Sequence, residues 1–260
     1  MLAKKFYFHQ ILFFIRSSRW KVSFVLKIFL TLTITLWLGN FALLSYFAAS
    51  ILKEINPSCS PIKLVNSGLI YYFIILFIIR FLFQKIPTPA VKPYLHLPIN
   101  KNKIIHYFLG RSFFNMFNIA PIFLFLPFSF RTISSVYSYY NALLWVAGIL
   151  IFTLCNNLLV LFLKIQLCKN LKTIAGIFSV FFFIMVLNYF NIISLKSISS
   201  KMFNGLLNNN LYIFIPLILF VSIYIFNSFY FRSLIYLDKF GNKITRNKET
   251  PKHIFNKDIE

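Results

Sequence analysis

The chain has 260 residues, of which 59% are hydrophobic and only 12% are charged, with a mean hydropathy of +0.75. A soluble domain is about 45–50% apolar and about 25% charged, so a soluble core cannot absorb this much apolar surface, and the lipid bilayer is the expected solvent. The net charge of +22 would suggest nucleic acid on a soluble protein, but here the basic residues gather at the ends of apolar runs, as in membrane proteins, and nucleic acid is not an expected partner.

The first segment, residues 1–27, is basic and aromatic and predicts a helix on the inner membrane surface, with an irregular basic segment as the alternative. It is not expected to be a signal peptide, because the basic lead is too long and the apolar run after it is long enough to cross a bilayer. Six apolar runs predict transmembrane helices at 28–52, 64–83, 112–130, 141–163, 173–195 and 211–231. The tail, 232–260, is polar and predicted to be partly disordered.

The distribution of Lys and Arg predicts the orientation. Six lie in the N-terminal segment, six in the stretch 80–111, three in 164–172 and seven in the tail, whereas the alternate loops hold only five. Cytoplasmic loops are rich in Lys and Arg, so both termini are predicted to be cytoplasmic. The predicted fold class is therefore all-α, a polytopic integral membrane protein of six transmembrane helices in residues 28–231, with a cytoplasmic loop at 84–110.

The predicted spans lack the side chains that most membrane enzymes and ion-coupled carriers use. All five acidic residues lie outside the spans: Glu54, Asp238, Glu249, Asp258 and Glu260. Ion-coupled carriers usually bury a carboxylate, and intramembrane proteases need Asp pairs or His and Glu ligands. The four histidines and three cysteines are scattered, and no P-loop motif occurs, so no catalytic, metal or cofactor site is predicted.

Asparagine is a frequent polar residue within the predicted spans. Two pairs, 115 with 118 and 188 with 191, are three residues apart and so share a helix face. The expected role of such amides in lipid is hydrogen bonding between helices, and the alternative is that some line a transport path. The residues considered for such a path are Asn115, Asn118, Asn156, Asn188 and Asn191.

The stretch Tyr94-Leu-His-Leu-Pro-Ile-Asn-Lys-Asn-Lys-Ile-Ile105 resembles the segment after the second span in membrane subunits of ABC-2-type exporters. Three further stretches look similar to a poorly characterised family of bacterial ABC-2-like permeases: Arg16-Ser-Ser-Arg-Trp20, Arg80 with Gln84-Lys-Ile-Pro87, and 112–118. The resemblance covers about residues 10–130. Members of that family often continue into a second membrane half, whereas this chain has six predicted spans.

The resemblance implies a permease subunit of the bacterial inner (cytoplasmic) membrane that pairs with a second permease subunit and a separate ABC ATPase. It also implies a coupling helix between the second and third spans, which sits on the ATPase; Pro98 suits the first turn of such a helix. The residues expected to couple are Leu95, Leu97, Pro98, Ile99, Lys101, Lys103, Ile104, Ile105 and Phe108. Aspartate in place of Leu97 or Ile104 is expected to uncouple transport without unfolding the spans.

Two other functions stay open at this point. The chain could be a non-transporting scaffold or assembly factor whose basic cytoplasmic face binds a partner or anionic membrane lipid. A membrane enzyme acting on lipid is the third hypothesis, against which the missing acids and histidines argue. For the leading hypothesis, the permease, the few charges in the spans favour a lipid-like or amphipathic cargo over a free ion.

Overall fold

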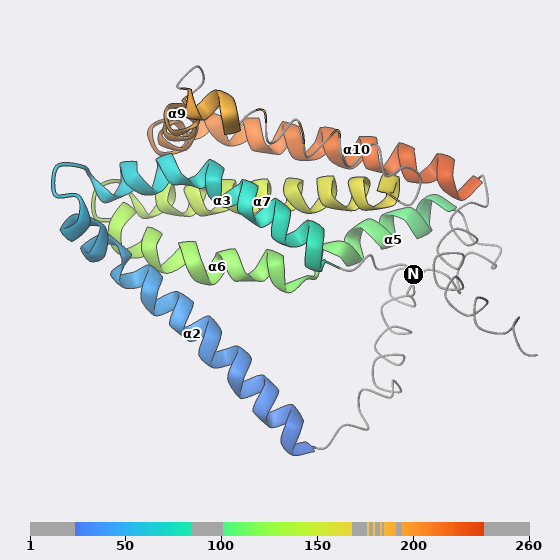
Figure 1. Cartoon of the computed structure of the whole chain (residues 1–260), viewed down its shortest axis with the longest axis horizontal. Helices are drawn as coiled ribbons and strands as arrows, with labels where there is room; N and C mark the ends of the chain where they lie inside the picture. Colours follow the sequence, from blue (N-terminus) through green and yellow to red (C-terminus); the bar gives the residue numbers. More distant parts are fainter. Residues whose placement is uncertain are drawn as a thin grey trace, which may run out of the picture. The chain divides into compact units, whose positions relative to one another are not determined.

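The computed structural model describes residues 24–84, 101–167, 176, 179, 183, 185–190 and 194–236. Within these residues all regular structure is helical and no strand occurs. The helices, in chain order, are α2 (Phe24–Ile55), α3 (Pro61–Phe83), α5 (Lys101–Phe113), α6 (Met116–Phe128), α7 (Tyr139–Leu167), α9 (Leu195–Asn208) and α10 (Phe214–Tyr236) (Figure 1). A π-helical turn, η3 (Ser129–Ile133), extends α6, and a 3-10 turn, η4 (Asn210–Ile213), precedes α10.

Five helical segments among the described residues are long and apolar enough to cross a membrane. They are Thr31–Ile55, Pro61–Phe83, Met116–Ile133, Tyr139–Gln166 and Asn210–Arg232. These segments overlap the first, second, third, fourth and sixth predicted spans. The fifth, 173–195, lies largely outside the described residues, as do almost all of the predicted surface helix and most of the tail. The architecture is typical of a multi-pass membrane protein.

The third predicted span begins later than the sequence indicated. Helix α5 ends at Phe113, and α6 begins only at Met116 after an extended Asn115. The side chain of Asn118 stabilises this break, because its Nδ2 donates to the carbonyl oxygen of Phe113 over 2.8 Å. At the other end of α6, Pro127 lacks an N–H group, and the π-helical turn η3 follows directly.

The chain divides into two compact units. Unit 1 contains Met1–Leu76, Phe113–Leu154 and Ser194–Ile218, and unit 2 contains Phe77–Ser112, Cys155–Ile193 and Leu219–Glu260. The divisions fall inside α3, α7 and α10, so each of these helices contributes residues to both units.

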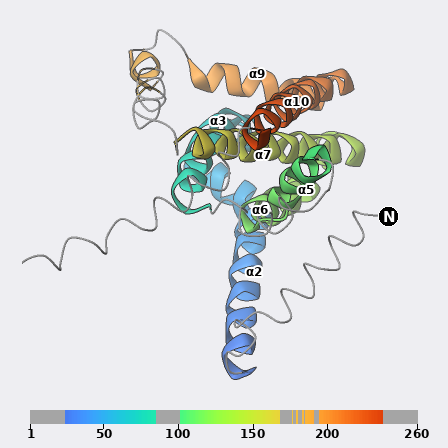
Figure 2. The same cartoon turned by 90° about the vertical axis from the view of Figure 1, so that its right-hand side faces the viewer.

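Aromatic side chains form the core of unit 1. Trp145 of α7 is fully buried, and the rings of Phe125 and Phe128 lie 5.9 and 6.0 Å from it. Helix α2 packs against α6, where Ser45 accepts a hydrogen bond from the Phe128 N–H over 3.0 Å, but its N-terminal half stands apart from α6 (Figure 2). Trp37 in that half is 63% exposed, as expected for a surface that lipid solvates.

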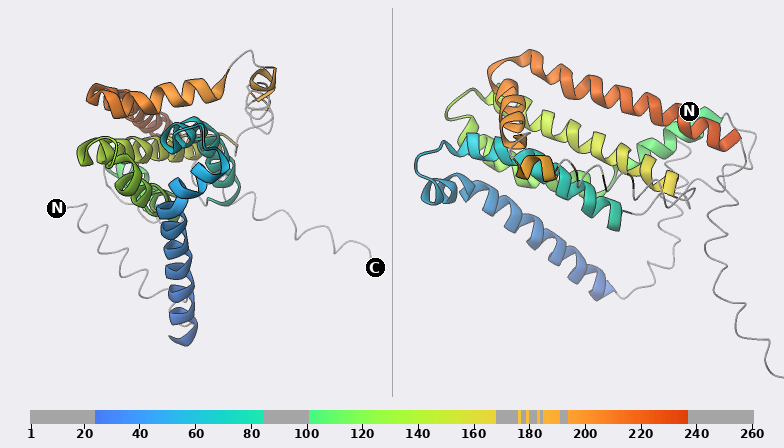
Figure 3. Two further views of the ribbon diagram at one scale, coloured as in Figure 1. Left: turned by 90° about the vertical axis from the view of Figure 1, so that its left-hand side faces the viewer. Right: turned by 45° about the horizontal axis from the view of Figure 1, so that its top comes forward.

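Helix α9 lies across α3 and α7, as Figures 1 and 3 show. Residues 196–210 connect the fifth and sixth predicted spans, and most of this connection is helical. Leu195, Ser199 and Phe203 are buried at four-residue intervals, together with Leu206 and Leu207. This is the period of a helix with one buried face. The stretch is too short and too polar to span a bilayer, which is why a search for long apolar runs missed it.

Candidate functional sites

Helix α5, the predicted coupling segment, has a buried apolar face and an exposed basic face. Ile104, Ile105 and Phe108 are 1%, 2% and 3% exposed. Phe108 meets the edge of Phe231 of α10, with ring centroids 5.5 Å apart, whereas Lys103 is exposed. The three apolar residues thus pack inside unit 2 and offer no surface to a separate ATPase. Lys101 begins the helix, and the other residues of the coupling set lie outside the described residues: Leu95, Leu97, Pro98 and Ile99.

Hydrogen bonds join α5 to two long helices of unit 2. His106 Nδ1 lies 2.7 Å from the hydroxyl oxygen of Tyr224 in α10, and the two rings stack with centroids 5.9 Å apart. At the end of α5, Ser112 Oγ accepts from Nδ2 of Asn157 in α7 over 3.0 Å. A displacement of α5 would therefore pull directly on α7 and α10.

A group of buried and half-buried polar side chains surrounds the second of these contacts. Gln84, directly after α3, donates from Nε2 to Oδ1 of Asn157 over 2.6 Å. The Lys164 ammonium group donates to the Gln84 carbonyl oxygen and lies 5.8 Å from the centre of the Phe81 ring. Arg80 is one helical turn before Gln84, whose N–H donates to the Arg80 carbonyl over 2.8 Å. We call this group the unit-2 polar cluster: Arg80, Gln84, Ser112, Asn157 and Lys164.

Arg80 departs from the sequence-based expectation. A cation in the last turn of a predicted span usually extends its side chain toward water, but Arg80 is 0% exposed. Buried cations in a membrane protein are costly, and they usually mark functional sites. The apolar run alone could not reveal this burial, because the residues that cover Arg80 depend on the packing of other segments.

The asparagines considered for a transport path are divided between the two units. Asn115 and Asn118 form the break before α6 in unit 1, whereas Asn156, which is 7% exposed, and Asn188 belong to unit 2. Asn191 lies outside the described residues. In unit 2 the amides of Gln84 and Asn157 meet, and the sequence signal for Asn157 was the double amide at 156–157.

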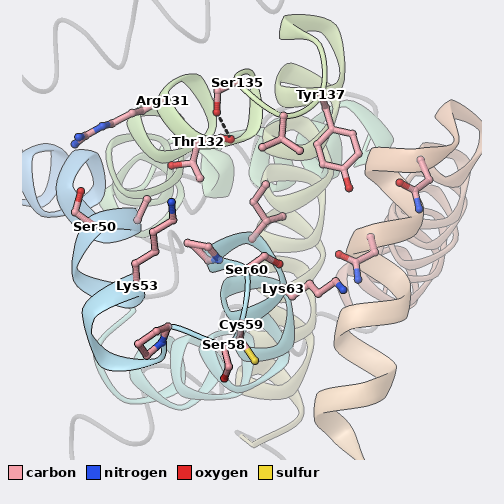
Figure 4. Close-up of a pocket in the computed structure, with 17 residues that line it drawn as sticks. Ser50, Lys53, Ser58, Cys59, Ser60, Lys63, Arg131, Thr132, Ser135 and Tyr137 are labelled. Carbon is pink, nitrogen blue, oxygen red and sulfur yellow. Dashed lines mark hydrogen bonds between the residues drawn. The ribbon is translucent and has the colours of Figure 1, made fainter.

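A basic pocket lies in unit 1, at the loop between α2 and α3. Its volume is about 860 Å³, and Figure 4 shows Arg131 and Thr132 across the cavity from Cys59. Three cationic side chains line it, Lys53, Lys63 and Arg131, and no acidic residue does among the part of the chain that the structure describes. The remaining lining residues are Ala49, Ser50, Pro57, Ser58, Cys59, Ser60, Pro61, Ile62, Thr132, Ser135, Val136, Tyr137, Asn204 and Asn208.

Arg131 is held in a fixed position at this pocket. Its Nη1 donates to the carbonyl oxygen of Tyr46 over 2.7 Å, and its guanidinium carbon lies 4.2 Å from the centre of the Tyr46 ring. Arginine combines such stacking with several further N–H donors. With two lysines and several hydroxyl and amide groups nearby, the pocket is chemically suited to an anionic group.

Comparison with known proteins gives one match. The model of a family of unknown function, DUF5687, matches residues 10–257, which include all the described residues. No curated protein and no solved structure matches the chain. The match supplies no activity, so the function must be argued from the residues themselves.

Proposed function

The chain belongs to the DUF5687 family, and we propose that it is the membrane-spanning permease subunit of an ABC-2-type exporter, driven by a separate ATPase. The observation that supports this proposal best is α5. It is a short helix between two apolar helices, it exposes a basic face, and it is bonded to α7 and α10 through Ser112 and His106. A coupling helix must have these two properties, a surface for the ATPase and a firm attachment to the spans.

The proposal includes a topology of six membrane-spanning helices with both termini in the cytoplasm of a bacterial cell and the chain in its cytoplasmic membrane. The fifth span would be formed by 173–195, and 1–27 would lie on the inner surface. The 22 to 5 distribution of Lys and Arg between alternate segments supports this arrangement. A second permease subunit would complete the transporter, and the chain itself would not be an enzyme.

In this mechanism the ATPase contacts the exposed face of α5. Lys103 and Arg111 are exposed there, so an acidic surface on the ATPase would complement them. Ile104, Ile105 and Phe108 anchor the helix in unit 2 and do not touch the ATPase. Closure of the ATPases on ATP would displace α5, and the bonds of Ser112 and His106 would transmit the displacement to α7 and α10.

The test is affinity purification from native membranes in a mild detergent, followed by mass spectrometry of the co-purifying proteins. The wild-type chain is expected to recover an ATPase in stoichiometric amount, and Lys103→Glu is expected to recover several-fold less. Lys201→Glu is the matched control, because it makes the same change at an exposed position of another helix, α9. Recovery of no ATPase, or of equal amounts with all three chains, would favour the scaffold hypothesis instead.

A further inference from the structure

A second cavity in unit 1 is almost entirely apolar. Its volume is about 370 Å³, and its lining consists of Leu44, Ser45, Ala48, Val65, Gly68, Leu69, Tyr72, Leu124, Phe125 and Phe128. The hydroxyl of Ser45 already accepts from the Phe128 N–H. We call this cavity the apolar groove.

The apolar groove and the basic pocket follow one another along the same three segments. On α2 the groove residues end at Ala48 and the pocket residues begin at Ala49. On α3, which runs the other way, the pocket residues end at Lys63 and the groove residues begin at Val65. From α6 into η3, the groove ends at Phe128 and the pocket begins at Arg131. The two cavities therefore adjoin one another along these segments, one of them apolar and the other cationic.

The basic pocket gathers cations on the side of the predicted membrane topology that holds few Lys and Arg residues. Only five of the 27 Lys and Arg residues fall in the loops predicted to face away from the cytoplasm, and three of these five line the basic pocket. Glu54, the only acidic side chain in the part of the chain that the structure describes, does not line it. A positive field confined to one cavity selects for an anion.

From this arrangement we propose that unit 1 binds one anionic phospholipid. Its phosphate would lie among Lys53, Lys63 and Arg131, and one of its acyl chains would lie in the apolar groove. A free anion would leave the groove unused, and a neutral lipid would leave the three cations without a counter-charge. Both volumes are within the range of about 300–1,000 Å³ that is usual for ligand pockets. The proposal involves neither α5 nor an ATPase, so it stands or falls independently of the permease function.

Trp145 allows a direct test. It is 0% exposed, and the rings of Phe125 and Phe128, which line the groove, separate it from the groove by one layer. With Trp20→Phe and Trp37→Phe, Trp145 is the only tryptophan in the chain. Bromine on an acyl chain quenches tryptophan only at short range, so a lipid outside the groove does not reach Trp145. The protein is reconstituted in phosphatidylcholine nanodiscs with small amounts of brominated phosphatidylglycerol. Saturable quenching is expected, with much weaker quenching by brominated phosphatidylcholine at equal amounts.

Matched variants separate the two parts of the site. Lys53→Gln with Lys63→Gln is expected to raise the half-quenching concentration of phosphatidylglycerol about tenfold or more, since each such charge contributes about 1 kcal/mol. Lys196→Gln with Lys201→Gln makes the same charge change in α9 outside the pocket and is expected to have no effect. Gly68→Leu is expected to weaken binding by filling the groove, and an added Cβ at this position meets no atom within 4 Å.

Three results would overturn the proposal. Equal quenching by the two brominated lipids would show no selection for an anion. An equal shift in the α9 control would show general surface attraction in place of a pocket. Competition by glycerol phosphate that is as strong as competition by unbrominated phosphatidylglycerol would show an anion site that does not use the groove. Loss of quenching in the pocket and groove variants alone supports the phospholipid site.

Discussion

The indole Nε1 of Trp145 in α7 donates a hydrogen bond to Oδ1 of Asn66 in α3 over 2.9 Å, and both side chains are 0% exposed. Asn66 extends this contact to a third helix, because its Nδ2 donates to Oδ1 of Asn204 in α9 over 2.7 Å. Its backbone carbonyl also accepts from the hydroxyl of Ser199. One amide therefore joins α3, α7 and α9 within unit 1.

The first prediction concerns Asn66→Leu. The change leaves the Trp145 N–H and the Asn204 amide without their partner, and each buried group left so costs about 1–3 kcal/mol. We expect a loss of about 2–4 kcal/mol in the free energy of unfolding, measured as a lower melting temperature by tryptophan fluorescence in detergent. Asn40→Leu, on the exposed part of α2, is the control and should change little. Equal melting temperatures for the two variants would contradict the linking role of Asn66.

The second prediction concerns Lys164→Met in the unit-2 polar cluster. Lys164 is half-buried and donates to the Gln84 carbonyl. Burying a charge carries a desolvation cost that Lys164→Met removes, and this gain offsets the loss of the single hydrogen bond to the Gln84 carbonyl. We therefore expect an unchanged or higher melting temperature. If the cluster acts in transport, the ATP hydrolysis of the co-purified complex should fall at the same time, and a variant with both properties unchanged would assign the cluster no role.

The sequence predicted the long helices well, because each contains an apolar run that is about long enough to cross a bilayer and is bounded by charged or polar residues. The charged residues Lys53 and Arg131 marked the ends of two predicted spans in the sequence. The two prolines inside α6 could also be located in the sequence. The polar contacts between helices could not be predicted from the sequence. Asn66 and Asn204 are 138 residues apart, and nothing local indicates that they meet.

From the sequence, the cationic residues of the basic pocket could be recognised only as separate basic residues in loops. Lys53, Lys63 and Arg131 come from different segments, and only folding brings them around one cavity. The coupling helix illustrates the same limit. Its amphipathic pattern was readable, but whether Ile104 faced another protein or its own unit depended on the position of α10.

The third prediction revises the expectation for Ile104→Asp. Because Ile104 is 1% exposed, a carboxylate at this position would be buried in an apolar environment. Burying a charge without a compensating ion pair or hydrogen bond is costly. We expect loss of folded protein, measured as aggregation in size-exclusion chromatography, rather than uncoupling of a folded permease. Lys103→Glu changes the neighbouring exposed residue and should elute like the wild type. A folded Ile104→Asp variant would show that α5 is not packed in unit 2 as described.

The fourth prediction tests how closely α7 approaches α9. A Cβ added to Gly148 would lie 2.8 Å from Cδ1 of Leu206, which is 3% exposed and has little room to move. Gly148→Val should therefore destabilise unit 1 by about 1–3 kcal/mol. Gly39→Val is the control, since an added Cβ there meets no atom within 4 Å and the helix-propensity cost is similar. Equal melting temperatures would exclude close packing at Gly148.

The fifth prediction uses the native cysteines to test the proposed topology. Cys59 is an exposed free thiol in the loop between α2 and α3, Cys155 is buried in α7, and Cys168 lies in the predicted cytoplasmic segment 164–172. With both termini cytoplasmic, Cys59 faces away from the cytoplasm. A membrane-impermeant maleimide added to intact spheroplasts should therefore label the wild-type chain, and Cys59→Ser should remove this label. Lysed spheroplasts of the Cys59→Ser chain should then become labelled at Cys168, and Cys168→Ser is the control for that signal. Labelling of Cys59 only after lysis would invert the topology, and it would place α5 and its basic face on the side that a cytoplasmic ATPase does not reach.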